Sequence, residues 1–129
     1  MPANGDAIRP LDGSAGSPDD LARLSLLRYG HDYWSAARIE AEIAQVGAWS
    51  RKHNVRVTCN EFGVYRRVAP SSDRATWIAD VRMILERQGI GWNLWDYAGD
   101  FGLVTKQAGT ILPDDTVVAA LGLRGSTRE

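Results

Sequence analysis

The chain has 129 residues and a formal net charge of −1, from 15 basic and 16 acidic residues. This balance argues against a nucleic-acid-binding protein, which usually carries a basic excess on one face. A hydrophobic content of 44% predicts one globular domain with its own core. The single cysteine excludes a disulfide within the chain.

The two ends of the sequence lack the periodicity of helices and strands. Residues 1–16 are rich in Pro, Gly, Ala, Asp and Ser and are predicted to be a flexible lead-in. They do not have the pattern of a signal peptide, and no apolar run approaches the length of a membrane span. As written, the sequence predicts a cytoplasmic protein with no membrane partner. Residues 124–129 are expected to be a frayed tail, which leaves residues 17–123 as the structured unit.

Two helices are expected in the first half of the chain. The first runs over residues 17–30, from a Ser-Pro start to a glycine. The second, over residues 36–53, is the longest, and either Asp32 or Ser35 can cap its N-terminus. Asn54 is expected to end it in the left-handed conformation.

Strands and helices then alternate. Residues 55–60 have the period-two pattern of a strand. A third helix is expected over residues 73–88, a second strand over residues 90–95, and a short last helix over residues 114–121. The apolar residues of the first strand are Val55, Val57 and Cys59.

The strand–helix–strand unit predicts an α/β fold. A crossover of this length implies two neighbouring parallel strands joined by a right-handed connection. Two strands are too few for a parallel sheet, which normally buries both of its faces. A complete (β/α)8 barrel takes roughly 250 residues. We therefore expect this chain to form part of a larger barrel.

Several common catalytic sites have no counterpart in the sequence. It contains no phosphate-binding loop, no H-E-x-x-H helix and no G-x-S-x-G elbow. His31 and His53 lie far apart with no cysteine beside either, so neither a metal site nor a cofactor is expected.

Carboxylates and aromatic residues cluster where the two strands end. Glu61 follows the first strand, and Trp95, Asp96 and Tyr97 follow the second. Active sites of α/β barrels lie at the C-terminal ends of the strands, so these groups are expected to meet at one rim. A carboxylate beside an indole ring suits sugar chemistry, because the ring stacks on a pyranose while the carboxylate attacks the anomeric carbon.

These motifs resemble the last part of a known catalytic domain. The run "VTCNEFGVYRR", a helix, and then "GIGWNLWDYAGDFGLV" are similar to glycoside hydrolase family 5, the endoglucanase-type cellulases. The similarity covers roughly residues 30–123 and implies strands seven and eight of a (β/α)8 TIM barrel with their flanking helices.

The resemblance assigns roles to individual residues. Glu61 of the Glu-Phe-Gly motif would be the nucleophile of a retaining double displacement on a β-linked polysaccharide. Trp95 would hold the sugar. Tyr65 and Phe101 have no role from the resemblance, but they lie in the loops expected at the rim and could line the cleft. The partner would therefore be a carbohydrate, and full-length relatives would be expected to be secreted.

One half of the chemistry is absent from the sequence. The family also needs an Asn-Glu-Pro whose glutamate is the general acid/base, and the chain has none. Asp96 on the next strand is a weak alternative. We therefore expect the isolated chain to be inactive. It could instead bind carbohydrate without hydrolysis, or be vestigial, in which case open strand edges predict self-association.

The direction of Glu61 is open at this level. If Val57 and Cys59 face the helices, strict alternation would turn Glu61 to the helices too. Either a bulge or a twist follows Asn60, or Val57 and Cys59 face the barrel interior.

Overall fold

A computed structural model describes residues 18–32 and 34–123 of the chain. The expected lead-in, Ser17 and the tail lie outside the described residues. In chain order the elements are α1 (Pro18–Asp32), α2 (Ala36–His53), β1 (Thr58–Phe62), α3 (Ser71–Arg87), β2 (Gly91–Leu94), β3 (Val104–Gln107), β4 (Thr110–Pro113) and α4 (Asp115–Ala120).

The expected caps of α2 are both present. The Ser35 side chain accepts a hydrogen bond from the N–H of Arg38 at 3.3 Å, so Ser35 rather than Asp32 is the cap. Asn54 has the left-handed conformation at φ 51° and ends the helix. Between these caps, Ile39 and Ile43 pack against the core. The boundaries of this helix are therefore set by local side-chain chemistry.

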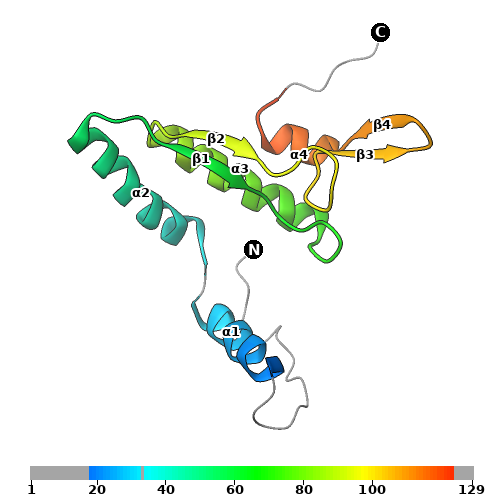
Figure 1. The fold of residues 1–129 in the computed structure, drawn as a ribbon, viewed down its shortest axis with the longest axis horizontal. Coiled ribbons are helices and arrows are strands. Elements are labelled where there is room, and N and C mark those ends of the chain that lie inside the picture. The colour runs from blue at the N-terminus through cyan, green and yellow to red at the C-terminus, as the bar shows by residue number, and fades with distance from the viewer. Residues whose placement is uncertain (1–17, 33, 124–129) are drawn as a thin grey trace.

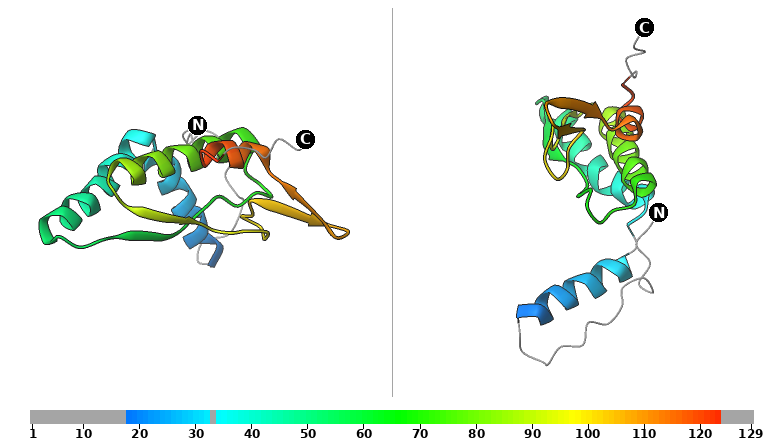
Figure 2. Two further views of the ribbon diagram at one scale, coloured as in Figure 1. Left: turned by 90° about the horizontal axis from the view of Figure 1, so that it is seen from above. Right: turned by 90° about the vertical axis from the view of Figure 1, so that its right-hand side faces the viewer.

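The parallel unit predicted from the sequence is confirmed. β1 pairs with β2 in parallel, and α3 connects them. The turned view shows the two strands on one side and α3 with α4 on the other (Figure 2). The most buried side chains lie between these layers and include Phe62, Ile78, Val81, Leu85 and Val117. One face of the sheet is thus covered by helices.

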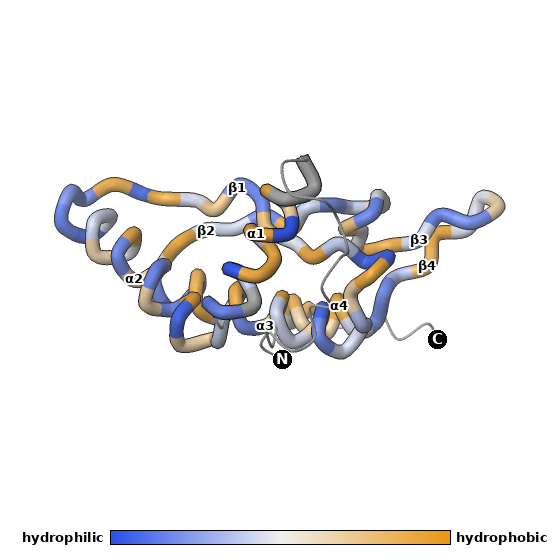
Figure 3. The backbone as a smooth tube through the Cα atoms, turned by 90° about the horizontal axis from the view of Figure 1, so that it is seen from below, coloured by the Kyte–Doolittle hydropathy of each residue, from blue (hydrophilic) through white to orange (hydrophobic). Residues whose placement is uncertain are grey.

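The two strands alternate between a covered and an open face. Val57, Cys59 and Trp92 pack against the core, whereas Thr58 and Asn93 are exposed. The tube coloured by hydropathy shows hydrophobic and hydrophilic residues alternating in the segment that leads into β1 (Figure 3). Val57 and Cys59 therefore face the helices, and the opposite face of the sheet is open in the part of the chain that the structure describes.

A hairpin that the sequence analysis did not predict follows β2. β3 and β4 pair antiparallel and project beside α4 (Figure 1). The two residues between them, Ala108 and Gly109, have φ 46° and 81°. Positive φ at both positions is the geometry of a type I′ turn, for which Asn-Gly is the usual signal. Ala108 lacks that signal, so the hairpin was missed.

The first helix is slightly longer than expected and lies apart from the other elements (Figures 1 and 2). Its side chains Leu21 and Leu24 are 73% and 62% exposed. Among the described helices, none combines the length and the apolar character needed to cross a membrane.

Candidate functional site

A β-bulge at the end of β1 sets the direction of Glu61. Cys59 pairs with Trp92, and Phe62 pairs with Leu94, so three steps along β1 match two along β2. The extra residue lets Cys59 and Phe62 both face the helices, with Asn60 and Glu61 exposed between them. Of the two alternatives left open by the sequence, the bulge is correct.

Glu61 is anchored through its neighbour rather than through its own side chain. Phe62 is 7% exposed and packs edge-on against Trp92, with ring centroids 5.7 Å apart. The Glu61 carboxylate is exposed and forms no ion pair with another residue of the described chain. Glu61 also lies inside β1, one residue before its end, and not just beyond the strand as expected. A buried aromatic anchor thus presents a free carboxylate on the open face.

Trp95 follows β2 on the same open face. Its N–H donates to the carbonyl oxygen of Phe62 at 2.8 Å, which extends the parallel ladder beyond Leu94. Leu94 packs toward the helices, so alternation turns Trp95 the other way, and its side chain is 50% exposed. The peptide bond after it is cis. The strand ladder therefore brings Glu61 and Trp95 to one end of the open face.

The other two predicted substrate-binding residues contact each other. The rings of Tyr65 and Phe101 lie 5.6 Å apart at an angle of 60°. Tyr65 belongs to the loop after β1, and Phe101 to the loop after β2. The backbone N–H of Arg66 also donates to the carbonyl of Asp100 at 2.9 Å. The two strand-end loops are therefore joined.

Asp96 does not supply a second free carboxylate. Its Oδ1 accepts the N–H of Gly99 at 2.9 Å, and its backbone carbonyl accepts the N–H of Leu103 at 3.0 Å. Through these two hydrogen bonds Asp96 stabilises the conformation of the glycine-rich loop. In residues 18–32 and 34–123, no group of three His, Cys, Asp or Glu side chains could hold a metal ion.

The chain was compared with protein-family profiles, with curated proteins and with solved structures. The chain matches no protein-family profile. It is 30% identical to a solved structure of cellulose synthase subunit Z from Clostridioides difficile, with a TM-score of 0.61 over 67% of this chain. A hyperthermophilic endo-β-1,4-glucanase, solved in complex with substrate, gives 30% identity and a TM-score of 0.60 over 67% of this chain. The chain resembles the endoglucanases of glycoside hydrolase family 5.

A curated relative points the same way. Endoglucanase 3 of Fibrobacter succinogenes is 28% identical over 76 residues, which is 57% of this chain. The endoglucanase-like chain spans 12% of that protein, and 28% and 27% of the two solved structures. These relatives are TIM-barrel glycoside hydrolases, so the described part corresponds to an α/β portion of such a barrel.

The endoglucanase-like chain contains a buried arginine that the sequence analysis missed. Arg74 on α3 is 2% exposed and pairs with the Asp114 carboxylate at 2.6 Å. It precedes Ile78, Val81 and Leu85 at helical spacing, so it continues the buried face of α3. That spacing is a signal in the sequence, but arginine is rarely buried, so the residue type alone favours a surface position.

Asp114 is held in its charged form. Burial alone would raise its pKa. Hydrogen bonds from the Thr116 side chain, the Val117 N–H and Arg74, together with the charge of Arg74, outweigh burial and hold the pKa of the Asp114 carboxyl below its usual value. The pair is therefore an ionised contact between α3 and the start of α4.

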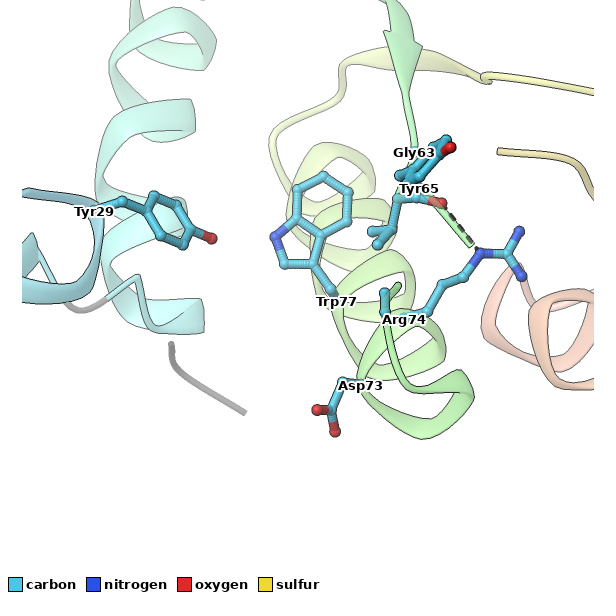
Figure 4. Close-up of a pocket in the computed structure, with 8 residues that line it drawn as sticks. Tyr29, Gly63, Tyr65, Asp73, Arg74 and Trp77 are labelled. Carbon is cyan, nitrogen blue, oxygen red and sulfur yellow. Dashed lines mark hydrogen bonds between the residues drawn. The ribbon is translucent and has the colours of Figure 1, made fainter. Parts of the chain in front are cut away.

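A cavity of about 470 Å³ lies behind the strand-end loop and not on the open face. Its lining residues are Tyr29, Gly63, Val64, Tyr65, Ala69, Asp73, Arg74 and Trp77. The close-up shows Tyr29 and Trp77 across this space, with Arg74 beneath the loop (Figure 4). Neither Glu61 nor Trp95 lines the cavity, so it is not the candidate site for sugar chemistry.

Proposed function

We propose that the chain is the strand-seven and strand-eight portion of a family 5 glycoside hydrolase whose parent activity is the cellulase-like hydrolysis of O-glycosidic bonds in a β-linked polysaccharide. The observation that carries this is the bulge in β1, which leaves the Glu61 carboxylate free on the face that Trp95 shares. Carbohydrate as the partner is supported by the endo-β-1,4-glucanase solved with its substrate.

Glu61 acts as the nucleophile in this proposal. Its carboxylate oxygen forms the bond to the anomeric carbon as the leaving oxygen departs with its electron pair, and water later releases the sugar. Trp95 holds the apolar face of the sugar ring, with Tyr65 and Phe101 beside it. A retaining mechanism needs a second carboxyl group about 5 Å from the first. Asp96, the alternative named from the sequence, uses its carboxylate to accept the N–H of Gly99, so the isolated chain is expected to turn over ordinary glycosides extremely slowly.

An activated substrate tests the nucleophile without the missing acid. The leaving group of 2,4-dinitrophenyl 2-deoxy-2-fluoro-β-cellobioside departs as a stable phenolate and needs no proton. We expect a covalent adduct on Glu61, detected by peptide mass spectrometry, that Glu61→Gln abolishes and Glu42→Gln leaves intact. A folded wild-type chain that forms no adduct, or forms it on another residue, would overturn the assignment.

Carbohydrate binding without hydrolysis is the second candidate function. It is favoured by the exposed ring of Trp95, beside which the Asp96 carboxylate is already bonded to the N–H of Gly99. Titration of the chain with cellohexaose, followed by tryptophan fluorescence, tests this function. We expect the fluorescence to change on binding, and no hydrolysis product to form. Trp95→Ala should abolish the response. Trp49→Ala is the matched control, because Trp49 is 53% exposed but lies on α2.

The domain limits at residues 17–123 and the secretion of a longer parent protein stay predictions. Reading the coding sequence upstream of Met1 would test the secretion, by revealing a secretion signal, and would show whether an in-frame Asn-Glu-Pro segment precedes this chain.

A further inference from the structure

The guanidinium of Arg74 donates hydrogen bonds to backbone carbonyls of both strand-end loops. Its Nε donates to the carbonyl of Val64 at 3.3 Å. Its Nη2 donates to the carbonyls of Phe101 and Gly102 at 3.0 and 2.7 Å, while Nη1 pairs with Asp114. The close-up shows the bond to the loop after β1 (Figure 4). One buried guanidinium therefore contacts three separate segments from a fourth.

These contacts lie directly behind the candidate site. Val64 is three residues after Glu61, and Phe101 is the ring that packs on Tyr65. Holding Val64 and Phe101 to one rigid group fixes the spacing between the loops, and so the place of each ring relative to the open face.

We propose that Arg74 is the positioning residue of the site. It couples the loop of residues 63–70 to the loop of residues 95–103 and keeps Tyr65, Phe101 and Trp95 in register with Glu61. Its consequence for sugar binding rests on the proposed function, whereas the coupling of the loops does not.

The planar guanidinium is essential to this role. Arginine has five N–H donors in a fixed fork, whereas lysine has three on one rotating nitrogen. A lysine at position 74 can keep the charge beside Asp114, but it cannot reach the carbonyls of both loops from one point. Arg74→Lys should therefore retain the fold and lose the coupling.

Arg82 provides a matched control on the same helix. It donates to the carbonyl of Ala120 at 3.0 Å and pairs with Glu86 at 2.6 Å. It thus links α3 to α4 as Arg74 does, but its contacts do not include either strand-end loop. Arg82→Lys tests the loss of an α3–α4 contact alone.

Amide hydrogen exchange of the free protein is the first measurement. The N–H groups of Arg66 and Leu103 report the two loops, and that of Gly91, bonded to the carbonyl of Val57, reports the strands. In Arg74→Lys we expect the loop amides to exchange about tenfold faster while Gly91 is unchanged, because lost charge-assisted bonds raise local opening. Arg82→Lys should leave the exchange rates of all three amides at their wild-type values, once any change in the free energy of global unfolding is taken into account. Equal acceleration of all three in Arg74→Lys, or no change, would overturn the proposal.

Cellohexaose binding is the second measurement. Arg74→Lys should weaken it about tenfold, in line with the same loss of preorganisation, and Arg82→Lys should not. If the wild-type chain does not bind cellohexaose at all, the second candidate function, carbohydrate binding by this chain, fails, while the exchange comparison still decides the role of Arg74. Unaltered binding by Arg74→Lys beside a binding wild type would contradict the proposal.

Discussion

Gly63 lies so close to Trp95 that a β-carbon on it would be 2.1 Å from the carbonyl oxygen of Trp95. No side chain can be accommodated at that separation without moving the backbone. The ladder bond from the Trp95 N–H to the carbonyl of Phe62, 2.8 Å long, holds the two strand ends at this distance. The glycine of the Glu-Phe-Gly motif is thus what allows Trp95 to stand beside Glu61.

Substituting this glycine should separate the two strand ends. We expect Gly63→Ala to lower the free energy of unfolding by about 1–3 kcal/mol, the usual cost of forcing atoms into a filled space. It should also abolish the fluorescence response of Trp95 to cellohexaose. Urea unfolding and the titration measure the two effects.

Gly91 provides the matched control. A β-carbon there would lie 3.3 Å from the Thr58 hydroxyl, the end of a side chain that can turn away. Gly91→Ala should therefore change stability by less than about 1 kcal/mol, since alanine also suits a strand better than glycine. If both variants lose the same stability, the close approach to Trp95 is not the cause.

Removing the Glu61 carboxylate should leave stability unchanged. The carboxylate is exposed and forms no ion pair with the described residues, so Glu61→Gln should shift the free energy of unfolding by less than about 0.5 kcal/mol. Thermal and urea unfolding measure this. A clear loss of stability would instead identify Glu61 as a structural residue of β1.

The Asp114 carboxyl should make stability depend on acid. Its folded-state pKa lies below the ordinary value of 3.8, so at acid pH the unfolded chain binds the proton more readily. The contribution is therefore complete above pH 3.8 and is lost as pH falls through the folded pKa. Unfolding midpoints across this range measure the loss. Asp114→Asn should be less stable at neutral pH and should show a flatter dependence below it; an unchanged slope would contradict this origin.

Local chemistry made part of this fold predictable. Ser35 and Asn54 bound α2 through capping rules that act within a few residues, and the period of β1 and α3 gave the parallel pair. The capping residues act within a few positions, and the period of a strand or helix is read from consecutive residues, so each of these signals is local in the sequence. The Glu-Phe-Gly motif nominates Glu61 in the same local way, and its role stays a prediction.

The parts that could not be predicted depend on distant contacts. The bulge that turns Glu61 to the open face appears only in the register of β1 against β2. Arg74 finds its partners 10 to 40 residues away, and a charged side chain is expected at the surface. The hairpin of β3 and β4 could not be predicted for a local reason, because Ala108 has a positive φ that alanine rarely adopts.

The open surfaces should make the isolated chain self-associate. Within the described residues β1 and β2 form a two-stranded sheet, so each keeps an unpaired edge, and Leu21 and Leu24 of α1 are largely exposed. We expect the sedimentation-derived mass to fall toward that of a monomer on dilution. The double substitution Leu21→Glu and Leu24→Glu should favour the monomer through charge repulsion and lost apolar contact. Gln45→Glu, at an exposed position on α2, controls for added charge. A chain that is monomeric throughout would refute the prediction, and association unchanged by the leucine substitutions would exclude α1 as its cause.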